Sequence, residues 1–212
     1  MPEDERWPRF ELVTYTTPTD IPHGWDRDLI ALGAPKRILG SYEAMSQLEL
    51  IEHPTLGPLV RFATIGIRRQ GAMCLHPATG SIRHLTGARS GQESFVNTTL
   101  AQFNESVHSV INRFPFDHGL PSNTSIQDVS AQWPASRTDQ REDVDWIAVG
   151  EELRELLRCI DPKSVADPNY YWSGFVDDVE MGNYSTDAVL NFPRQGGIVS
   201  KRSAQDRHAH EN

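Results

Sequence analysis

An amphipathic stretch in the middle of the chain, FVNTTLAQFNESVHSVINRF at residues 95–114, constrains the fold more than any other feature. Its large apolar side chains recur at the spacing of one helix face. They are Val96, Leu100, Phe103, Val107, Val110, Ile111 and Phe114. Such a stripe must be buried against another layer, and each large side chain contributes roughly 1.5 to 3 kcal/mol before entropy is counted. The chain therefore contains a long helix that packs on an apolar layer.

The start of this helix has two interpretations. The triplets at 97–99 (NTT) and 104–106 (NES) match the acceptor pattern for N-glycosylation. The first also fits a helix start, either with Asn97 as the N-cap or with Thr99 as the N-cap and Gln102 completing a capping box. The N-terminal residues MPEDERWPRF lack the apolar region of a signal peptide. We therefore interpret these triplets as parts of a helix in a cytoplasmic protein.

The cysteine count agrees with that compartment. The chain has two cysteines, Cys74 and Cys159, which allow at most one disulfide. We expect both to be free thiols in a reducing environment.

Three predicted strands precede the helix. LVRFATIGI at 59–67, GAMCLHP at 71–77 and SIRHL at 81–85 are rich in apolar and β-branched residues, and the breaks between them contain glycine. This pattern predicts a three-stranded antiparallel meander. The first strand has little alternation, which indicates burial on both faces near the middle of a sheet. A short strand at 10–15 and a short helix from about Asp26 to Gly33 are expected before it.

The remaining chain alternates between connections and helices. Residues 115–141 form a polar connection, residues 144–161 contain a helix that ends before Pro162, and residues 168–182 form another with Pro168 in its first turn. The apolar residues of the first of these helices, at helical spacing, are Ile147, Leu153, Leu156, Leu157 and Ile160. The sequence thus predicts a single α+β domain, with a twisted antiparallel sheet flanked by helices. Its predicted divisions are an extension at 1–24, the domain at 25–190 and a disordered tail at 191–212.

Negative charge is concentrated near the C-terminus. The net charge is −9, and residues 139–187 alone contain thirteen Asp and Glu against four Lys and Arg. An acidic surface repels nucleic acid and attracts basic partners, although a solvated helix face gives the same pattern. The longest nearly apolar run, at 59–67, is too short to cross a membrane. We therefore expect neither a nucleic-acid nor a membrane partner.

One group of residues could in principle bind a metal. Cys74, His76 and His84 are possible zinc ligands in the predicted hairpin. A turn centred on Thr79 would place Cys74 opposite His84, whereas a two-residue loop at Thr79 and Gly80 would place His84 opposite Leu75 and disperse the group. A fourth ligand is missing, a Cys–His dyad would lack an orienting group, and no standard catalytic or phosphate motif is present. We expect no enzymatic activity, metal or cofactor, and a small hydrolase or metal enzyme built on these residues is the least favoured alternative.

The order of these parts resembles the SUKH superfamily, and most closely its fourth subfamily of bacterial immunity proteins. The similarity covers residues 25–187, with Ala34 where the family usually has leucine. It rests on LGAP at 32–35, LVRFATIGI, the hairpin CLHPATGSIRHL, the helix entry FVNTTLAQF, and IDP followed by YYWSGFVDDVEMG.

The resemblance implies an α+β fold without enzymatic activity that binds and neutralises a cognate toxin of a polymorphic or contact-dependent system. Such toxins often act on nucleic acid, and a regulatory or scaffold module like the cell-wall-assembly regulators of the same superfamily is the alternative. Because the cleft of a toxin acting on nucleic acid is expected to be basic, we expect the last two helices to supply the binding surface. Trp172 falls on the apolar face of its helix, which favours a core position. The candidate partner-binding residues are Glu151, Glu152, Glu155, Asp177, Asp178, Glu180, Tyr170 and Trp172.

Overall fold

A six-stranded antiparallel sheet forms one layer of the domain. The computed structural model describes residues 8–16, 18–40, 42–66, 70–87, 92–116, 144–186 and 189. Strands follow the order β3-β4-β5-β6-β7-β8, so each pairs with its neighbour in the chain. Their bounds are β3 Arg37–Ile38, β4 Tyr42–His53, β5 Gly57–Ile65, β6 Gly71–Leu75, β7 Ile82–Leu85 and β8 Glu93–Asn97. The predicted meander is confirmed as the centre of a larger one, and the α+β fold class is confirmed.

The first part of the chain packs beside this sheet. Strand β1 (Leu12–Val13) pairs with β2 (Ala34–Pro35), and helix α1 (Arg27–Leu32) lies between them in the chain. Gly33 follows α1 with a φ of 68°, and a Cβ there would come within 2.7 Å of the Val13 carbonyl oxygen. Only glycine fits this position without displacing β1. The predicted strand at 10–15 is thus only two residues long, and the expected short helix is present.

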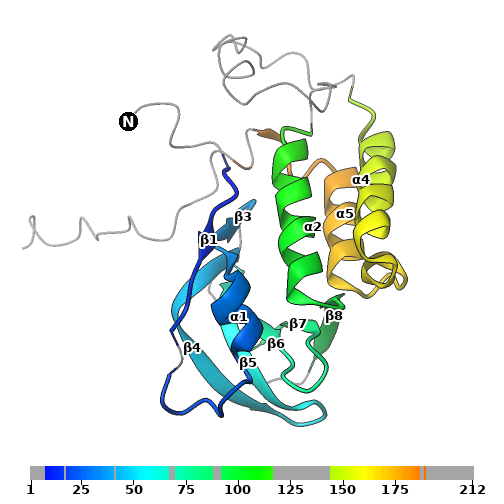
Figure 1. Ribbon diagram of the computed structural model, residues 1–212. Helices are drawn as coiled ribbons and strands as arrows, with labels where there is room; N and C mark the ends of the chain where they lie inside the picture. Colours follow the sequence, from blue (N-terminus) through cyan, green and yellow to red (C-terminus); the bar gives the residue numbers. More distant parts are fainter. Residues whose placement is uncertain are drawn as a thin grey trace, which may run out of the picture.

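Helices form the second layer. They are α2 (Leu100–Arg113), α4 (Trp146–Ile160) and α5 (Tyr171–Glu180), with a short 3₁₀ helix, η3 (Pro162–Val165), between the last two. Figure 1 shows α2, α5 and α4 next to one another beside the sheet. All seven apolar residues of the predicted stripe at 96–114 are buried, which confirms it. The core also includes Tyr15 and Ile21 from the N-terminal segment.

The caps of these helices differ in one case from the prediction. Thr99 is the N-cap of α2, and its hydroxyl accepts a hydrogen bond from the Gln102 amide at 3.2 Å. Helix α5 begins at Tyr171 and not at Pro168, because the Asp167 side chain accepts a hydrogen bond from the Asn169 amide and holds the preceding residues in a turn. The apolar spacing from which the helix was predicted does not reveal this hydrogen bond between a side chain and the backbone.

A buried polar network joins the end of β8 to the helices. The Asp161 carboxylate accepts hydrogen bonds from the Thr98 amide at 2.6 Å, the Thr98 hydroxyl at 3.1 Å and Asn97 Nδ2 at 3.3 Å. It also accepts from the Lys163 amide at 3.2 Å. Asn97 Oδ1 in turn accepts from Trp172 Nε1 at 2.8 Å. Asn97, the other candidate N-cap, is therefore a member of the core.

The remaining predictions about chain organisation concern segments outside the described residues. The 115–141 connection falls almost wholly within residues 117–143, and the expected tail falls within 191–212. Among the helices of the described part, none is both long and apolar enough to cross a membrane.

Candidate partner-binding surface

Helices α4 and α5 form an antiparallel hairpin. Gly182, which follows α5, lies against the ring of Trp146 at the start of α4, and Gly150 of α4 lies against Glu180 near the end of α5. We call this end of the hairpin the tip, and the opposite end, where Asp161 and η3 lie, the root. The tip thus combines the first turn of α4 with the last turn of α5.

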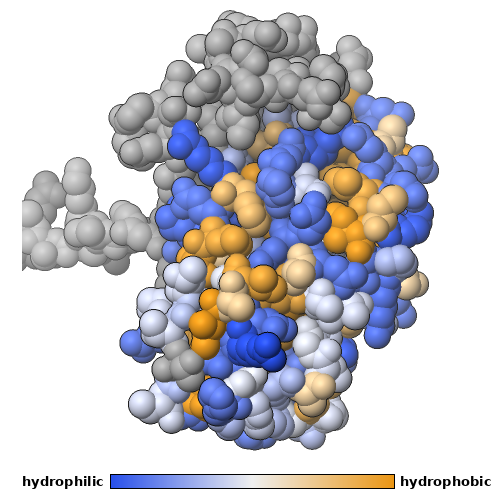
Figure 2. Space-filling view, in the orientation of Figure 1, coloured by the Kyte–Doolittle hydropathy of each residue, from blue (hydrophilic) through white to orange (hydrophobic). Residues whose placement is uncertain are grey.

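One side of the hairpin, the outer face, faces away from the sheet. On α4 the residues of this face recur every three or four positions, and exposed residues of α5 lie beside them. The outer face consists of Ile147, Glu151, Arg154 and Arg158 on α4, and Gly174, Asp177 and Met181 on α5 and just after it. In Figure 2, hydrophilic residues line the outer edge of the part that α4 forms, next to a group of hydrophobic residues.

Several predicted acidic residues gather on this face or directly beside it. Arg154 donates hydrogen bonds to both Asp177, at 3.1 Å, and Glu180, at 3.0 Å. Glu155 is paired with Arg158 one turn later, and Glu151 is exposed. The charges of the outer face itself balance, with Glu151 and Asp177 against Arg154 and Arg158. The adjoining Glu155 and Glu180, which pair with these arginines, add two carboxylates, so this side of the hairpin carries a net negative charge.

The other two predicted acidic residues have different positions. Glu152 points toward α2 and accepts two hydrogen bonds from Arg113, at 2.9 and 2.8 Å. The same bonds hold the pKa of Glu152 below its usual value. Asp178 is half-buried and accepts a hydrogen bond from Asn183 at 3.2 Å. Glu152 therefore belongs to a clamp between α2 and α4 more than to the outer face.

The two predicted aromatic residues lie at the root. Trp172 is fully buried and hydrogen-bonded to Asn97. This confirms the core position predicted from the apolar face of its helix. Tyr170 is half-buried and packs on Phe95, with ring centroids 5.2 Å apart. Neither ring is on the outer face.

The tip instead exposes two aliphatic side chains that the sequence did not single out as partner contacts. Ile147 is 65% exposed and Met181 is 67% exposed. Ile147 had been grouped with the apolar stripe of α4, and that assignment is wrong. Trp146, Val149, Leu153 and Leu157 provide the packing at this helix, which turns Ile147 outward. A stripe count could not show this, because Trp146 and Ile147 are adjacent and only one of them can face the core.

A family model identifies the chain. The model is described as SUKH-4 immunity protein, and it matches residues 21–178, about three-quarters of the 212 residues. The chain belongs to the SUKH-4 immunity protein family. No curated protein and no solved structure matches it significantly. Membership in SUKH-4 suggests a toxin-neutralising immunity function, and immunity proteins of this kind are generally non-catalytic.

Three of the segments that carry the SUKH-4 resemblance meet at the root. Asn97 and Thr98 come from the helix entry FVNTTLAQF, Asp161 comes from IDP, and Trp172 comes from YYWSGFVDDVEMG. All four are joined in the buried polar network. These motif residues therefore hold the fold together, and the partner-binding residues must be sought elsewhere.

The proposed metal ligands of this SUKH-4 chain are not brought together. Leu75 pairs with Ile82, Cys74 with Arg83 and Met73 with His84, which is neither of the two predicted registers. The hairpin closes at His76, whose amide bonds to the Ser81 carbonyl oxygen at 2.9 Å, so its loop has four residues. Cys74 and His84 consequently point to opposite faces of the sheet. Within the described ranges no three His, Cys, Asp or Glu side chains are arranged to hold a metal ion.

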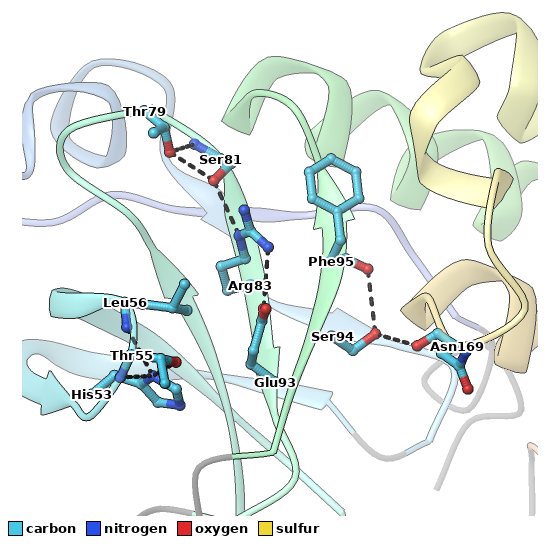
Figure 3. Close-up of polar contacts among 10 residues, drawn as sticks. All are labelled: His53, Thr55, Leu56, Thr79, Ser81, Arg83, Glu93, Ser94, Phe95 and Asn169. Atoms are coloured by element: carbon cyan, nitrogen blue, oxygen red, sulfur yellow. Dashed lines mark hydrogen bonds and ion pairs between the residues drawn. The ribbon is translucent and has the colours of Figure 1, made fainter.

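The sheet face that carries Cys74 has a chain of polar contacts instead (Figure 3). Thr79 and Ser81 share a hydrogen bond of 2.8 Å, Arg83 Nε donates to Ser81 at 3.2 Å, and Arg83 Nη1 donates to Glu93 at 3.1 Å. Ser94 lies on the other face, opposite His84, and donates to the Asn169 carbonyl oxygen at 2.8 Å. The charge of Arg83 is thus matched by a carboxylate within the sheet.

The buried neutral imidazole of His84 is expected to make the stability of the fold sensitive to acid. Its ring packs on Tyr171, with centroids 5.3 Å apart, and burial lowers its pKa from 6.5 to about 4. Protonation therefore favours the unfolded chain. The contribution of neutral His84 is complete above the unfolded pKa of 6.5 and is lost as the pH falls from there toward 4, by at most about 3 kcal/mol.

Urea unfolding of His84→Gln at about pH 7 and about pH 4.5 measures this contribution. The variant is expected to lose less stability on acidification than the wild type. His108→Gln is the control, because His108 is a half-buried residue of α2. The same loss in wild type and His84→Gln would contradict the prediction.

Proposed function

We propose that this SUKH-4 chain protects a cell by binding a cognate toxin, and that the toxin is a basic domain acting on nucleic acid. The observation that carries the proposal is the charge of the helical hairpin. Residues 144–186 contain nine Asp and Glu against three Lys and Arg. A domain that binds nucleic acid gathers lysine and arginine at its cleft. An acidic hairpin seated there would block the cleft and speed association by electrostatic attraction.

The internal ion pairs of the hairpin are compatible with this role. The carboxylates of Asp177 and Glu155 are 52% and 62% exposed, and ion pairs of exposed carboxylates are worth roughly 0 to 1 kcal/mol. A lysine or arginine of the toxin can therefore compete for these carboxylates at little cost. Glu151 lies beside them and is exposed to the same partner.

Charge reversal tests the proposed function. The chain is co-expressed with the toxin domain encoded by the neighbouring gene, and survival and toxin affinity are measured. Combining Glu151→Lys, Glu155→Lys and Asp178→Lys is expected to abolish protection and weaken binding by about a hundredfold or more at low salt, because like charges then face each other. The salt dependence of the remaining binding is expected to fall as well.

A matched variant separates local charge from total charge. Asp20→Lys, Glu52→Lys and Glu105→Lys change the net charge equally, at exposed positions outside the hairpin. This control is expected to protect like the wild type. Full protection by the hairpin variant, or equal losses in both variants, would contradict the acidic docking surface.

A further inference from the structure

The outer face of the hairpin contains a glycine that the fold does not require. Gly174 lies inside α5, where glycine is less favourable than alanine because it loses more backbone entropy on folding. The other two glycines of the hairpin have structural reasons. A Cβ on Gly150 would overlap Glu180, and Gly182 has a φ of 74°. A Cβ on Gly174 would have no heavy atom within 4 Å, so packing within the described chain does not explain it.

Gly174 lies in line with the apolar tip. Gly174, Asp177 and Met181 follow one another at spacings of three and four, which places them on one stripe of α5. Met181 and Ile147 are the two most exposed large hydrophobic side chains of the described residues. The stripe therefore runs from Gly174, past the Asp177 carboxylate, to Met181 at the tip, where Ile147 of α4 is also exposed.

We propose that the outer face seats a basic segment of the toxin, whose backbone crosses α5 at Gly174 and whose apolar side chain packs on Ile147 and Met181. This inference rests on the proposed function and adds the docking position to it. A missing Cβ allows another backbone to approach a helix most closely. Exposed apolar groups surrounded by charge are the usual composition of a binding centre and its rim. Glu151 and Asp177 on this face, with the adjoining exposed Glu155, supply carboxylates complementary to lysine and arginine.

A second apolar patch on the molecule does not fit the same partner. Figure 2 shows hydrophobic residues over β1 and α1, where Leu12, Ile30 and Leu32 are exposed. The segment 27–37 that carries two of them has three basic residues and one acidic residue. Its charge would repel a basic segment, so this patch provides matched controls.

Two readouts on Gly174 variants test the proposal. The probe is a catalytically inactive form of the toxin domain used in the protection experiment, and its Kd is measured by calorimetry alongside the Tm of each variant. Gly174→Ala is expected to raise the Tm by about 2 °C because it stabilises α5. It is also expected to weaken binding about tenfold, and Gly174→Leu by about a hundredfold, because each added group blocks the close approach.

Variants of the tip complete the test. Ile147→Ser and Met181→Ser are each expected to weaken binding about tenfold, whereas Ile30→Ser and Leu32→Ser are expected to change the Kd less than about twofold. Wild-type Kd values for both Gly174 variants would overturn the docking position, even if charge reversal still abolishes protection. Parallel losses of Tm and affinity would also overturn it, since they would indicate a structural role. A wild-type chain that neither binds nor protects against the toxin would overturn the proposed function together with this inference.

Discussion

Replacing Asp161 by alanine is expected to lower the free energy of unfolding by about 4 kcal/mol, the cost typical of removing one partner from a buried charged network. The carboxylate is only 2% exposed and accepts four hydrogen bonds. Its loss removes the acceptor of the part-buried Thr98 and Lys163 donors and one of the two acceptors of the buried Asn97 Nδ2. A buried donor that loses its acceptor is costly. The remaining polar groups of the network would then be desolvated without being fully hydrogen-bonded, which destabilises the folded state.

Urea unfolding of the purified variants measures this effect. Asp167→Ala is the matched control, because Asp167 also accepts two hydrogen bonds, from Asn169, but lies in an exposed turn. It is expected to cost about 1 kcal/mol or less. Asp161→Asn should fall between the two, since it keeps the size of the side chain and loses the charge. A cost for Asp161→Ala no greater than that of Asp167→Ala would contradict the role assigned to the network.

Replacing Trp172 by alanine is expected to be at least as damaging, at about 5 kcal/mol, which corresponds to a fall in Tm of roughly 10 °C or more. The indole is among the largest fully buried side chains and packs edge-on against Phe175, with ring centroids 5.5 Å apart. The truncation leaves a cavity, and it also deprives Asn97 Oδ1 of its donor. Both consequences act at the root of the hairpin.

Thermal unfolding of two variants divides this effect into its parts. Trp172→Phe fills much of the cavity but lacks the indole N–H, so it is expected to cost about 2 to 3 kcal/mol. Trp146→Ala, on the half-buried tryptophan at the tip, serves as the control and is expected to cost less than Trp172→Ala. If the Asn97–Trp172 hydrogen bond contributes to stability, Trp172→Phe should lower the free energy of unfolding less in an Asn97→Ala background than in the wild type. Purely additive losses would contradict that coupling.

Local patterns made the helical part of this fold predictable. The stripe from Val96 to Phe114 has a single consistent period, and Thr99 with Gln102 marks its start by a bond between near neighbours. The same holds for α1, which Gly33 ends. In each case the residues that decide the structure lie within a few positions of one another, so the sequence displays the cause directly.

The sheet was harder to predict because its causes are distant. Strand β4 (Tyr42–His53) contains Glu, Ser and Gln, has a register shift between Ala44 and Glu49, and gains its structure from pairing with β5. The register of β6 and β7 depends on a four-residue loop, which no alternation pattern specifies. A shift of one residue moved His84 to the face opposite Cys74 and removed the candidate metal site.

The acidic surface was predictable in composition and unpredictable in detail. The excess of Asp and Glu is visible in the sequence, but the pairing of Glu152 with Arg113 joins residues 39 positions apart. The outward position of Ile147 depends on which of two adjacent residues packs on α5, and Gly174 is conspicuous only once its surroundings are known to be open. The family membership indicates the binding function, whereas the proposed position of the binding surface could be inferred only from the structure.

The separation of root and tip has a consequence for how such a protein can change. The buried network fixes the hairpin at the end where Asp161 and Trp172 lie, while Ile147 and Met181 at the tip contribute little to the core. Exposed substitutions away from buried networks usually alter stability by less than about 0.5 kcal/mol. A lineage facing a new toxin could therefore exchange the residues of the outer face one at a time while the scaffold stays folded at every step. Specificity and foldability would then be inherited as two nearly independent traits.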